Sequence, residues 1–144
     1  MTRDDLILAV LSAASGRPLT PVQLQKAAFL ATRNIAGLVD EGPSFNFEAY
    51  DYGPFDRAVY VSAEQLEGEG LAEITRLQSS NWKTYTASPG GLAHGRTVLA
   101  RMKSEQSGYL ETAVDWVLKL SFADLVKSIY EAYPEMRANS IFRG

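Results

Sequence analysis

The sequence contains no cysteine and a single histidine, His94, among its 144 residues. The missing cysteines exclude a disulfide scaffold, a thiolate zinc site, an iron–sulfur cluster and a cysteine nucleophile. One histidine is too few for a multi-histidine metal site. Without a G-x-S-x-G elbow, His94 is also a weak candidate for a general base. We therefore expect no metal, no cofactor and no catalytic residue, and a protein that is not an enzyme.

Long hydrophobic runs are also missing. No apolar run approaches the roughly 18 residues that a membrane-spanning helix needs. The N-terminal segment carries acidic residues before a short apolar run and has no basic region, so it is predicted to be a helix and not a signal peptide. We expect a cytoplasmic protein that makes no membrane contact. The 46% hydrophobic and 22% charged residues are typical of a globular chain, and the length fits a single domain over residues 1–144.

Cap and stop signals divide the chain into six predicted helices. Thr2, Thr20 and Ser121 each have an acidic or glutamine side chain three residues later, which is the pattern of a capping box. Glycines after the second and third helices are typical of left-handed caps. The pair Ser107-Gly108 is predicted to separate the fourth helix from the fifth. The predicted helices cover residues 3–14, 21–36, 55–69, 90–105, 109–119 and 121–133.

Two segments between the third and fourth helices are predicted to pair as a hairpin. Residues 71–75 and 82–86 have strand composition, and the polar residues 78–81 form the turn. Earlier in the chain, residues 45–47 are predicted to be a short strand and residues 52–54 a turn. This element order predicts a mainly α (α+β), winged-helix-like domain. Its core covers about 19–105, and a helical C-terminal extension covers about 109–144.

Two resemblances to known families support this interpretation. Residues 70–74 and 85–88 resemble winged-helix regulators, in which a Gly-Leu strand follows the recognition helix and a Tyr-Thr strand leads into the next helix. Residues 19–26, with the sequence LTPVQLQK, resemble a helix start of the YwgA-like and SocA-like (Panacea) proteins. The phenylalanine-rich stretch 45–50, the Tyr-Gly-Pro-Phe of residues 52–55 and Gly70-Leu71 extend this second resemblance over about residues 19–92.

The second resemblance implies an antitoxin-type domain, which binds and neutralises a toxin protein and is found in many bacterial defence loci. It does not imply catalysis. We therefore expect a non-enzymatic module that covers a functional surface of a partner protein, such as a toxin or a defence effector. The oligomeric state stays open, a homodimer included.

Charge is distributed unevenly along the chain. Residues 40–73 contain nine acidic residues and one basic residue, Arg57, which gives a formal charge of −8. Residues 76–105 contain five basic residues and one acidic residue, Glu105, which gives +4. An acidic third helix would repel the phosphates of DNA and would steer a basic protein partner. The alternative is a solvated acidic face without a partner.

The predicted partner-binding residues combine an aromatic turn with the charged third helix. They are Tyr50, Tyr52, Phe55, Arg57, Glu64, Glu67 and Glu69. Tyrosine is enriched in binding hot spots, but aromatic side chains at a turn more often pin one helix to another. Trp82 is predicted to be exposed and is a further candidate for an interaction. The tail 137–143 either binds the partner or straps over the body.

The alternative function is a winged-helix DNA-binding transcriptional regulator, since wings often contact phosphates. Its predicted nucleic-acid-binding residues are Arg76, Lys83, Arg96, Arg101 and Lys103. A hydrolase or a magnesium site would have to use the pair Asp51 and Asp56 or the pair Glu64 and Glu67. Magnesium needs more oxygen ligands than either pair offers, so a solvated face is the preferred interpretation of these carboxylates.

Overall fold

Six α-helices and two antiparallel strand pairs make up the part of the chain that the structure describes, residues 1–77 and 82–143 of a computed structural model. The predicted mainly α (α+β) class is confirmed. The helices are α1 (Arg3–Ala13), α2 (Pro21–Asn34), α3 (Arg57–Gly68), α4 (Pro89–Arg101), α5 (Ser104–Lys119) and α6 (Phe122–Ala132). The other elements are β1 (Glu48–Tyr50), β2 (Gly53–Phe55), β3 (Ala72–Arg76), β4 (Lys83–Ala87) and the 3-10 turn η1 (Pro134–Arg137). Within these residues no helix is long and apolar enough to cross a membrane.

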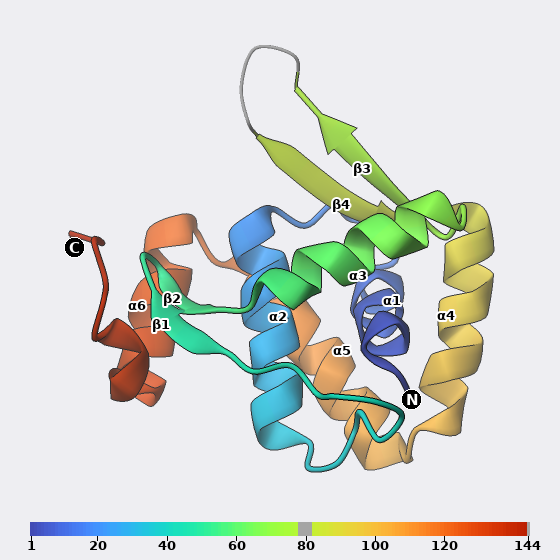
Figure 1. Cartoon of the computed structure of the whole chain (residues 1–144), viewed down its shortest axis with the longest axis horizontal. Helices are drawn as coiled ribbons and strands as arrows, with labels where there is room; N and C mark the ends of the chain where they lie inside the picture. The colour runs from blue at the N-terminus through green and yellow to red at the C-terminus, as the bar shows by residue number, and fades with distance from the viewer. Residues whose placement is uncertain (78–81, 144) are drawn as a thin grey trace.

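Helix α1 lies at the centre of the molecule and packs against α3, α4 and α5 (Figure 1). Every residue from Leu6 to Ala14 is buried, although the sequence pattern predicted one apolar face. A helix that is apolar all round belongs in the interior. The predicted capping box is confirmed, because the Thr2 hydroxyl accepts a hydrogen bond from the Asp5 amide (3.1 Å) and the Asp5 carboxylate accepts one from the Thr2 amide (3.0 Å).

Two glycines let α4 pack closely on its neighbours. A side-chain carbon at Gly95 would lie 1.7 Å from the Ser12 hydroxyl oxygen on α1. One at Gly91 would lie 1.8 Å from the backbone oxygen of Leu71. The Ser12 hydroxyl donates a hydrogen bond to the Gly91 carbonyl at 3.3 Å. Glycine lowers helix propensity, so these positions are explained by close packing and not by local preference.

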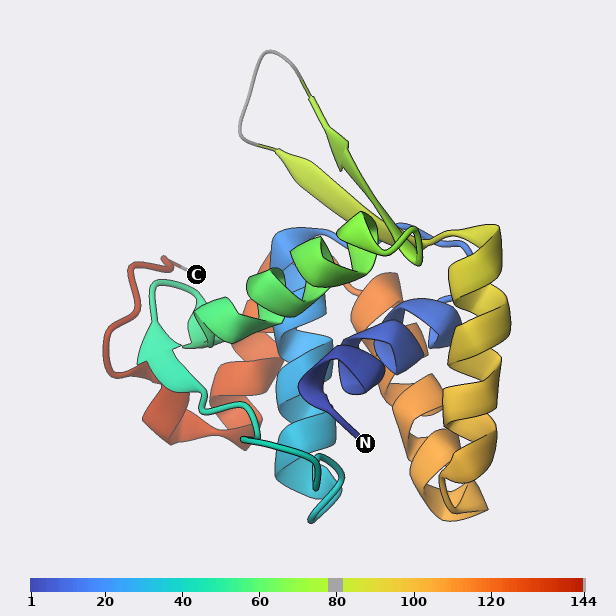
Figure 2. The ribbon, with the colours of Figure 1, turned by 45° about the vertical axis from the view of Figure 1, so that its right-hand side comes forward.

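The predicted hairpin after α3 is confirmed as β3 and β4, which pair from Ala72 with Ala87 to Arg76 with Lys83. It projects from the helical body as a wing (Figure 2). Leu19 pairs with Tyr85 through two backbone hydrogen bonds of 2.9 Å, which join the base of the wing to the segment before α2. The predicted turn at 78–81 lies outside the described residues.

Three local predictions are wrong, in whole or in part. The strand before α3 lies at β1, not at 45–47, and Gly53-Pro54 belongs to β2 and not to a turn. The Phe47 ring contacts the rings of Phe45 and Phe29 instead, so core packing overrides the strand pattern. The fourth helix ends at Arg101, and Ser107-Gly108 lies inside α5. The break falls at Met102 and Lys103, whose backbone is extended. The Lys103 amide then caps α5 by donating a hydrogen bond to the Gln106 side chain at 3.1 Å.

The C-terminal tail straps over the β1–β2 hairpin, which was one of its two predicted roles. The Asn139 side chain donates a hydrogen bond to the Ala49 carbonyl at 3.0 Å. The Ile141 amide donates one to the Asp51 carbonyl, also at 3.0 Å. These bonds hold the turn between β1 and β2 on the molecular surface.

Candidate functional site

An apolar pocket of about 390 Å³ opens between the start of α2, the β1–β2 turn, the wing and the start of α6. We call it the aromatic pocket, because Tyr52, Trp82 and Phe122 line it and are 37%, 51% and 47% exposed. The remaining lining residues are Thr20, Pro21, Val22, Gln23, Leu120 and Leu125. Exposed apolar residues gathered around a pocket, and not scattered singly, are typical of an interaction site.

Local structure explains why these aromatic residues stay at the surface. Tyr52 lies in the two-residue turn between β1 and β2. Phe122 is the first residue of α6, directly after the cap Ser121, whose hydroxyl accepts the Asp124 amide at 3.1 Å. The Tyr52 and Phe122 rings meet edge to face with centroids 5.1 Å apart. This contact orders both side chains without burying either.

A second pocket, of about 180 Å³, adjoins the aromatic pocket and shares Val22 and Tyr52 with it. We call it the Lys26 pocket, after the α2 lysine that lines it. Lys26 is only 3% exposed. Burial disfavours the charged form of an amine, and it lowers the pKa of Lys26 to about 7. A functional site is a common place for such a group.

The neighbour of Lys26 on α2 has a structural role. The Gln25 side chain donates to the Asp56 carbonyl and accepts from the Asp56 amide, both at 3.0 Å. Asp56 in turn caps α3, because its carboxylate accepts the Ala58 amide at 2.9 Å. This bridge fixes α2 against the start of α3, and thereby fixes the wall of the Lys26 pocket.

The structure places the predicted aromatic turn residues around the same pockets. Tyr50 is 52% exposed and stacks on Phe55, with ring centroids 4.8 Å apart. Phe55 contacts Tyr60 edge to face at 5.7 Å, and Tyr60 stacks on Tyr85 at 6.1 Å. The aromatic residues therefore connect the turn to α3 and the wing, and Tyr50 and Tyr52 remain exposed as well.

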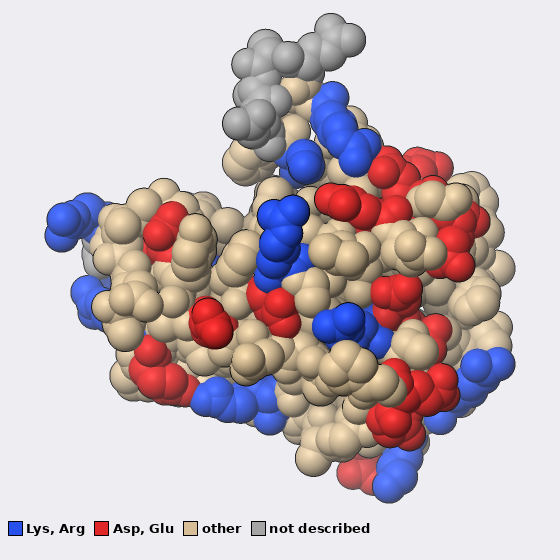
Figure 3. All heavy atoms as spheres, viewed as in Figure 1, with Lys and Arg blue, Asp and Glu red and all other residues tan. Residues whose placement is uncertain are grey.

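The predicted acidic residues of α3 are less available than the sequence indicated. Acidic side chains gather over the C-terminal half of α3 (Figure 3). Glu67, however, accepts two hydrogen bonds from the guanidinium of Arg76, at 2.9 and 3.1 Å. This contact lowers the pKa of Glu67. Glu64 and Glu69 are exposed, and Arg57 and Glu64 line a groove of about 340 Å³ together with Lys83 of the wing.

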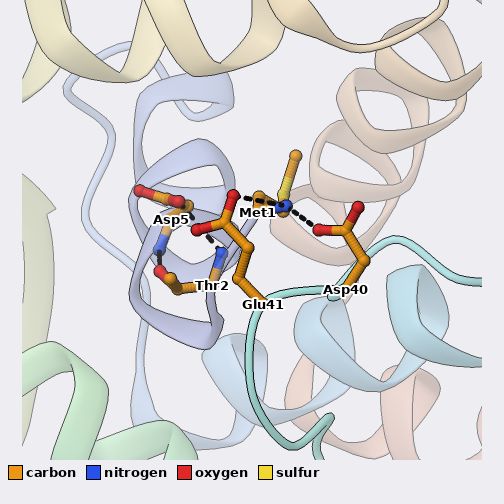
Figure 4. A network of polar contacts seen from close by, with 5 residues as sticks. All are labelled: Met1, Thr2, Asp5, Asp40 and Glu41. Atoms are coloured by element: carbon orange, nitrogen blue, oxygen red, sulfur yellow. Dashed lines mark hydrogen bonds and ion pairs between the residues drawn. The ribbon is translucent and has the colours of Figure 1, made fainter.

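Other acids of the −8 segment point away from α3 or serve local structure. The amino group of Met1 lies between Asp40 and Glu41 and forms ion pairs with both (Figure 4). The hydrogen bond from the Met1 amino group lowers the pKa of the Asp40 carboxyl. Asp56 is used as a helix cap. The prediction of one acidic face is therefore too broad, because part of its charge is neutralised or used inside the fold.

The predicted nucleic-acid-binding residues fall into two groups. Arg76 and Lys83 lie on the wing, where Glu67 pairs with Arg76 and Glu64 shares a groove with Lys83. Arg96, Arg101 and Lys103 are exposed on α4 and just after it. Arg101 lines a pocket that also contains Asp40 and Glu41. Three of the five predicted DNA-contacting residues, Arg76, Lys83 and Arg101, therefore have acidic residues beside them.

The structure separates the residues that the sequence offered for catalysis or metal binding. His94 is exposed on α4, away from the aromatic pocket and the Lys26 pocket. Across residues 1–77 and 82–143, no three His, Cys, Asp or Glu side chains form a group that could hold a metal ion. Asp51 lines the Lys26 pocket, whereas Asp56 caps α3, so this pair has two separate roles.

Sequence reasoning missed Phe122 and Lys26. Phe122 directly follows a helix cap, and this position was a usable signal for exposure. Lys26 is the last residue of the LTPVQLQK segment, but a lysine in a helix is ordinarily expected in solvent. Its burial depends on β1 and β2, which lie more than twenty residues away in the sequence.

Comparison with protein families and with curated proteins found no match that would assign a role to these pockets. The resemblance to the YwgA-like and SocA-like proteins therefore rests on the sequence motifs alone. No family model matches the chain, and no curated protein matches it either.

Proposed function

We propose that this chain is a non-enzymatic protein-binding domain that neutralises a partner by covering its functional surface, as an antitoxin or a defence-locus accessory protein does. The observation that carries the proposal is the aromatic pocket, where Tyr52, Trp82 and Phe122 are exposed together around about 390 Å³. Tyrosine and tryptophan are the residue types most enriched in binding hot spots.

Hydrogen bonds within the chain fix two walls of the aromatic pocket in the absence of a partner. The Asp51 carbonyl next to Tyr52 accepts hydrogen bonds from the tail, including one from the Ile141 amide. The start of α2 is fixed by its capping box, in which the Thr20 hydroxyl accepts the Gln23 amide at 3.2 Å and the Gln23 side chain accepts the Thr20 amide at 2.9 Å. Preorganisation of this kind lowers the entropy cost of binding.

Charge supports a basic partner surface at the edge of the same face. Glu64 and Glu69 remain exposed on α3, and the groove that Glu64 lines also contains Pro21, which the aromatic pocket shares. Such charges raise the association rate and the specificity more than the final affinity. In this proposal the aromatic pocket supplies the contact energy and α3 steers the approach.

The test is capture from the native host at low and moderate salt, with proteins and nucleic acid both identified. The Tyr52→Ala/Phe122→Ala double variant should lose the captured protein, because it removes two exposed aromatic side chains of the pocket. The matched control is Arg96→Ala/Arg101→Ala on α4, which should retain the protein. A further variant, Glu64→Lys/Glu69→Lys, should slow association with a basic partner.

The opposite pattern would contradict the proposal. DNA that is captured in place of a protein, lost as salt rises and lost in the α4 variant, would identify a DNA-binding regulator. A protein that is retained equally by the wild type and the Tyr52/Phe122 variant would show that binding uses a different surface.

A further inference from the structure

Lys26 lies beneath the backbone of the β1–β2 hairpin. Gly53 has a φ of +104°, and a side-chain carbon at this position would lie 3.5 Å from Nζ of Lys26 and 3.4 Å from the Tyr130 ring. The hairpin, α2 and α6 therefore meet around the end of this lysine. Its 3% exposure is that of a core residue.

Across residues 1–77 and 82–143, no carboxylate pairs with the ammonium group of Lys26. No residue that the structure describes forms a hydrogen bond or an ion pair with its Nζ. Among the residues that the structure describes, Asp51 is the one acidic residue that lines the Lys26 pocket, and its carboxylate makes no such contact. Burial makes the charged form of this amine costly, and an anion beside Nζ is what would offset that cost.

We propose that the Lys26 pocket binds a single carboxylate whose ligand extends an apolar group into the aromatic pocket. Lys26 supplies one positive charge, and no other basic residue of the described part of the chain lines the pocket. One charge among aromatic walls suits a carboxylate better than a phosphate, which needs more donors. Val22 and Tyr52 line both pockets, so the two pockets are neighbours and the apolar group has a short path from one to the other.

This inference goes beyond the proposed function, because the carboxylate does not have to come from a partner protein. A free carboxylic acid presents the same chemical group to Lys26. The pH titration of Lys26 with hexanoate tests the carboxylate site even if no partner protein is found. The probes are hexanoate, its neutral analogue hexanamide, and inorganic phosphate.

Binding should depend on pH through Lys26. The titratable and charged groups that face it are Tyr50, Asp51 and Tyr52 of the hairpin, Tyr60 of α3 and Tyr130 of α6, with Arg137 stacked over the Tyr130 ring. Only the charged amine pairs with a carboxylate, so hexanoate affinity should be constant well below pH 7 and fall about tenfold per pH unit above it. Bound hexanoate should in turn raise the pKa of Lys26 by at least one unit.

The experiment follows the ε-methylene signal of Lys26 by NMR in the full-length protein, with carbon-13-labelled lysine and pH varied from 5 to 11. The Lys26→Met variant assigns the signal and should abolish hexanoate binding, which is followed there by backbone amide shifts. The Asp51→Asn variant is the second test. It should bind hexanoate several-fold more tightly, because it removes a repelling carboxylate from the pocket.

Three results would overturn the site. Lys26 in the wild type could titrate near pH 10 and shift down in Asp51→Asn, which would make Asp51 its counter-ion. Hexanamide or phosphate could bind as tightly as hexanoate, which would remove the carboxylate requirement. Hexanoate could leave the Lys26 signal unchanged at every pH.

A last pair of probes distinguishes the two sources of the carboxylate. One is an apolar tripeptide amide with an internal glutamate, and the other is the same peptide with glutamine. Glutamate-dependent binding to Lys26 supports a carboxylate from a protein. Binding of hexanoate alone supports a small acid, and failure of both contradicts the proposal.

Discussion

Two halves of this molecule use their side chains differently. Around α1, every residue from Leu6 to Ala14 is buried, and α4 approaches so closely that glycine is required at two positions. Around the β1–β2 hairpin, by contrast, three aromatic residues are exposed at one pocket, and in the next lies a lysine that pairs with no carboxylate of the described residues. The first half buries its side chains closely, whereas the second keeps aromatic side chains at the surface and an amine at a pocket wall.

The largest effect should come from truncation inside the first half. Leu11 is fully buried on α1, and Leu11→Ala should lower the free energy of unfolding by about 2–5 kcal/mol through lost burial and a cavity. Phe122→Ala in the second half should change it by less than about 0.5 kcal/mol, as exposed positions usually do. Urea denaturation of both variants checks the contrast, and equal losses would refute it.

The next effect concerns the buried lysine and pH. Lys26 has a folded pKa of about 7, whereas an unfolded lysine titrates near 10.4. Between these values the unfolded state binds one more proton, so the free energy of unfolding should rise with pH by about 1.4 kcal/mol per unit. The free energy of unfolding of the wild type minus that of Lys26→Met, measured from pH 7 to 10, isolates this term. A flat difference would show that Lys26 keeps its charge on folding.

Close helix packing predicts an effect of intermediate size. Gly91→Ala places a carbon against the Leu71 backbone and should cost about 1–3 kcal/mol. The matched control is Gly108→Ala in α5, where nothing lies within 4 Å of the added carbon. That variant should stabilise the fold by up to about 1 kcal/mol through helix propensity. Thermal unfolding of the pair measures both signs, and a loss of stability in Gly108→Ala would show a hidden constraint in α5.

The smallest stability effect compares two helix caps. Thr2 and Thr20 form equivalent capping boxes on α1 and α2, and each change to alanine should cost about 1 kcal/mol. Only Thr20 lines the aromatic pocket, so Thr20→Ala should also weaken partner binding. Thr2→Ala should leave binding unchanged. A common loss of affinity in both variants would mean that binding follows stability and not the pocket.

Local patterns predicted most of the helices and the wing, since their signals act over a few residues. The Thr20–Gln23 and Thr2–Asp5 capping boxes are hydrogen bonds within one turn, and they form as predicted. The local patterns predicted the wrong structure where contacts between residues far apart in sequence set the backbone conformation. Phe47 packs on Phe29 and Phe45 instead of forming a strand with its neighbours, and the α4–α5 break falls before Ser107.

The candidate site shows the same division. Tyr50, Tyr52 and Trp82 could be selected from the sequence, because turns and hairpins place side chains at the surface. The pairing of Glu67 with Arg76 could not, and it weakens both the acidic-face and the DNA-contact predictions. Charge counted along a segment does not say which charges meet across the fold.

The element order, the caps and the aromatic turn follow from the sequence, because each depends on neighbours in the chain. That α1 is surrounded, that Phe122 joins Tyr52 and Trp82 at one pocket, and that Lys26 is buried with no carboxylate of the described residues beside it became evident in the folded chain. Burial and pairing depend on segments that lie far apart in sequence. For Lys26, the cover comes from a hairpin whose position is set by α2, α6 and the tail together.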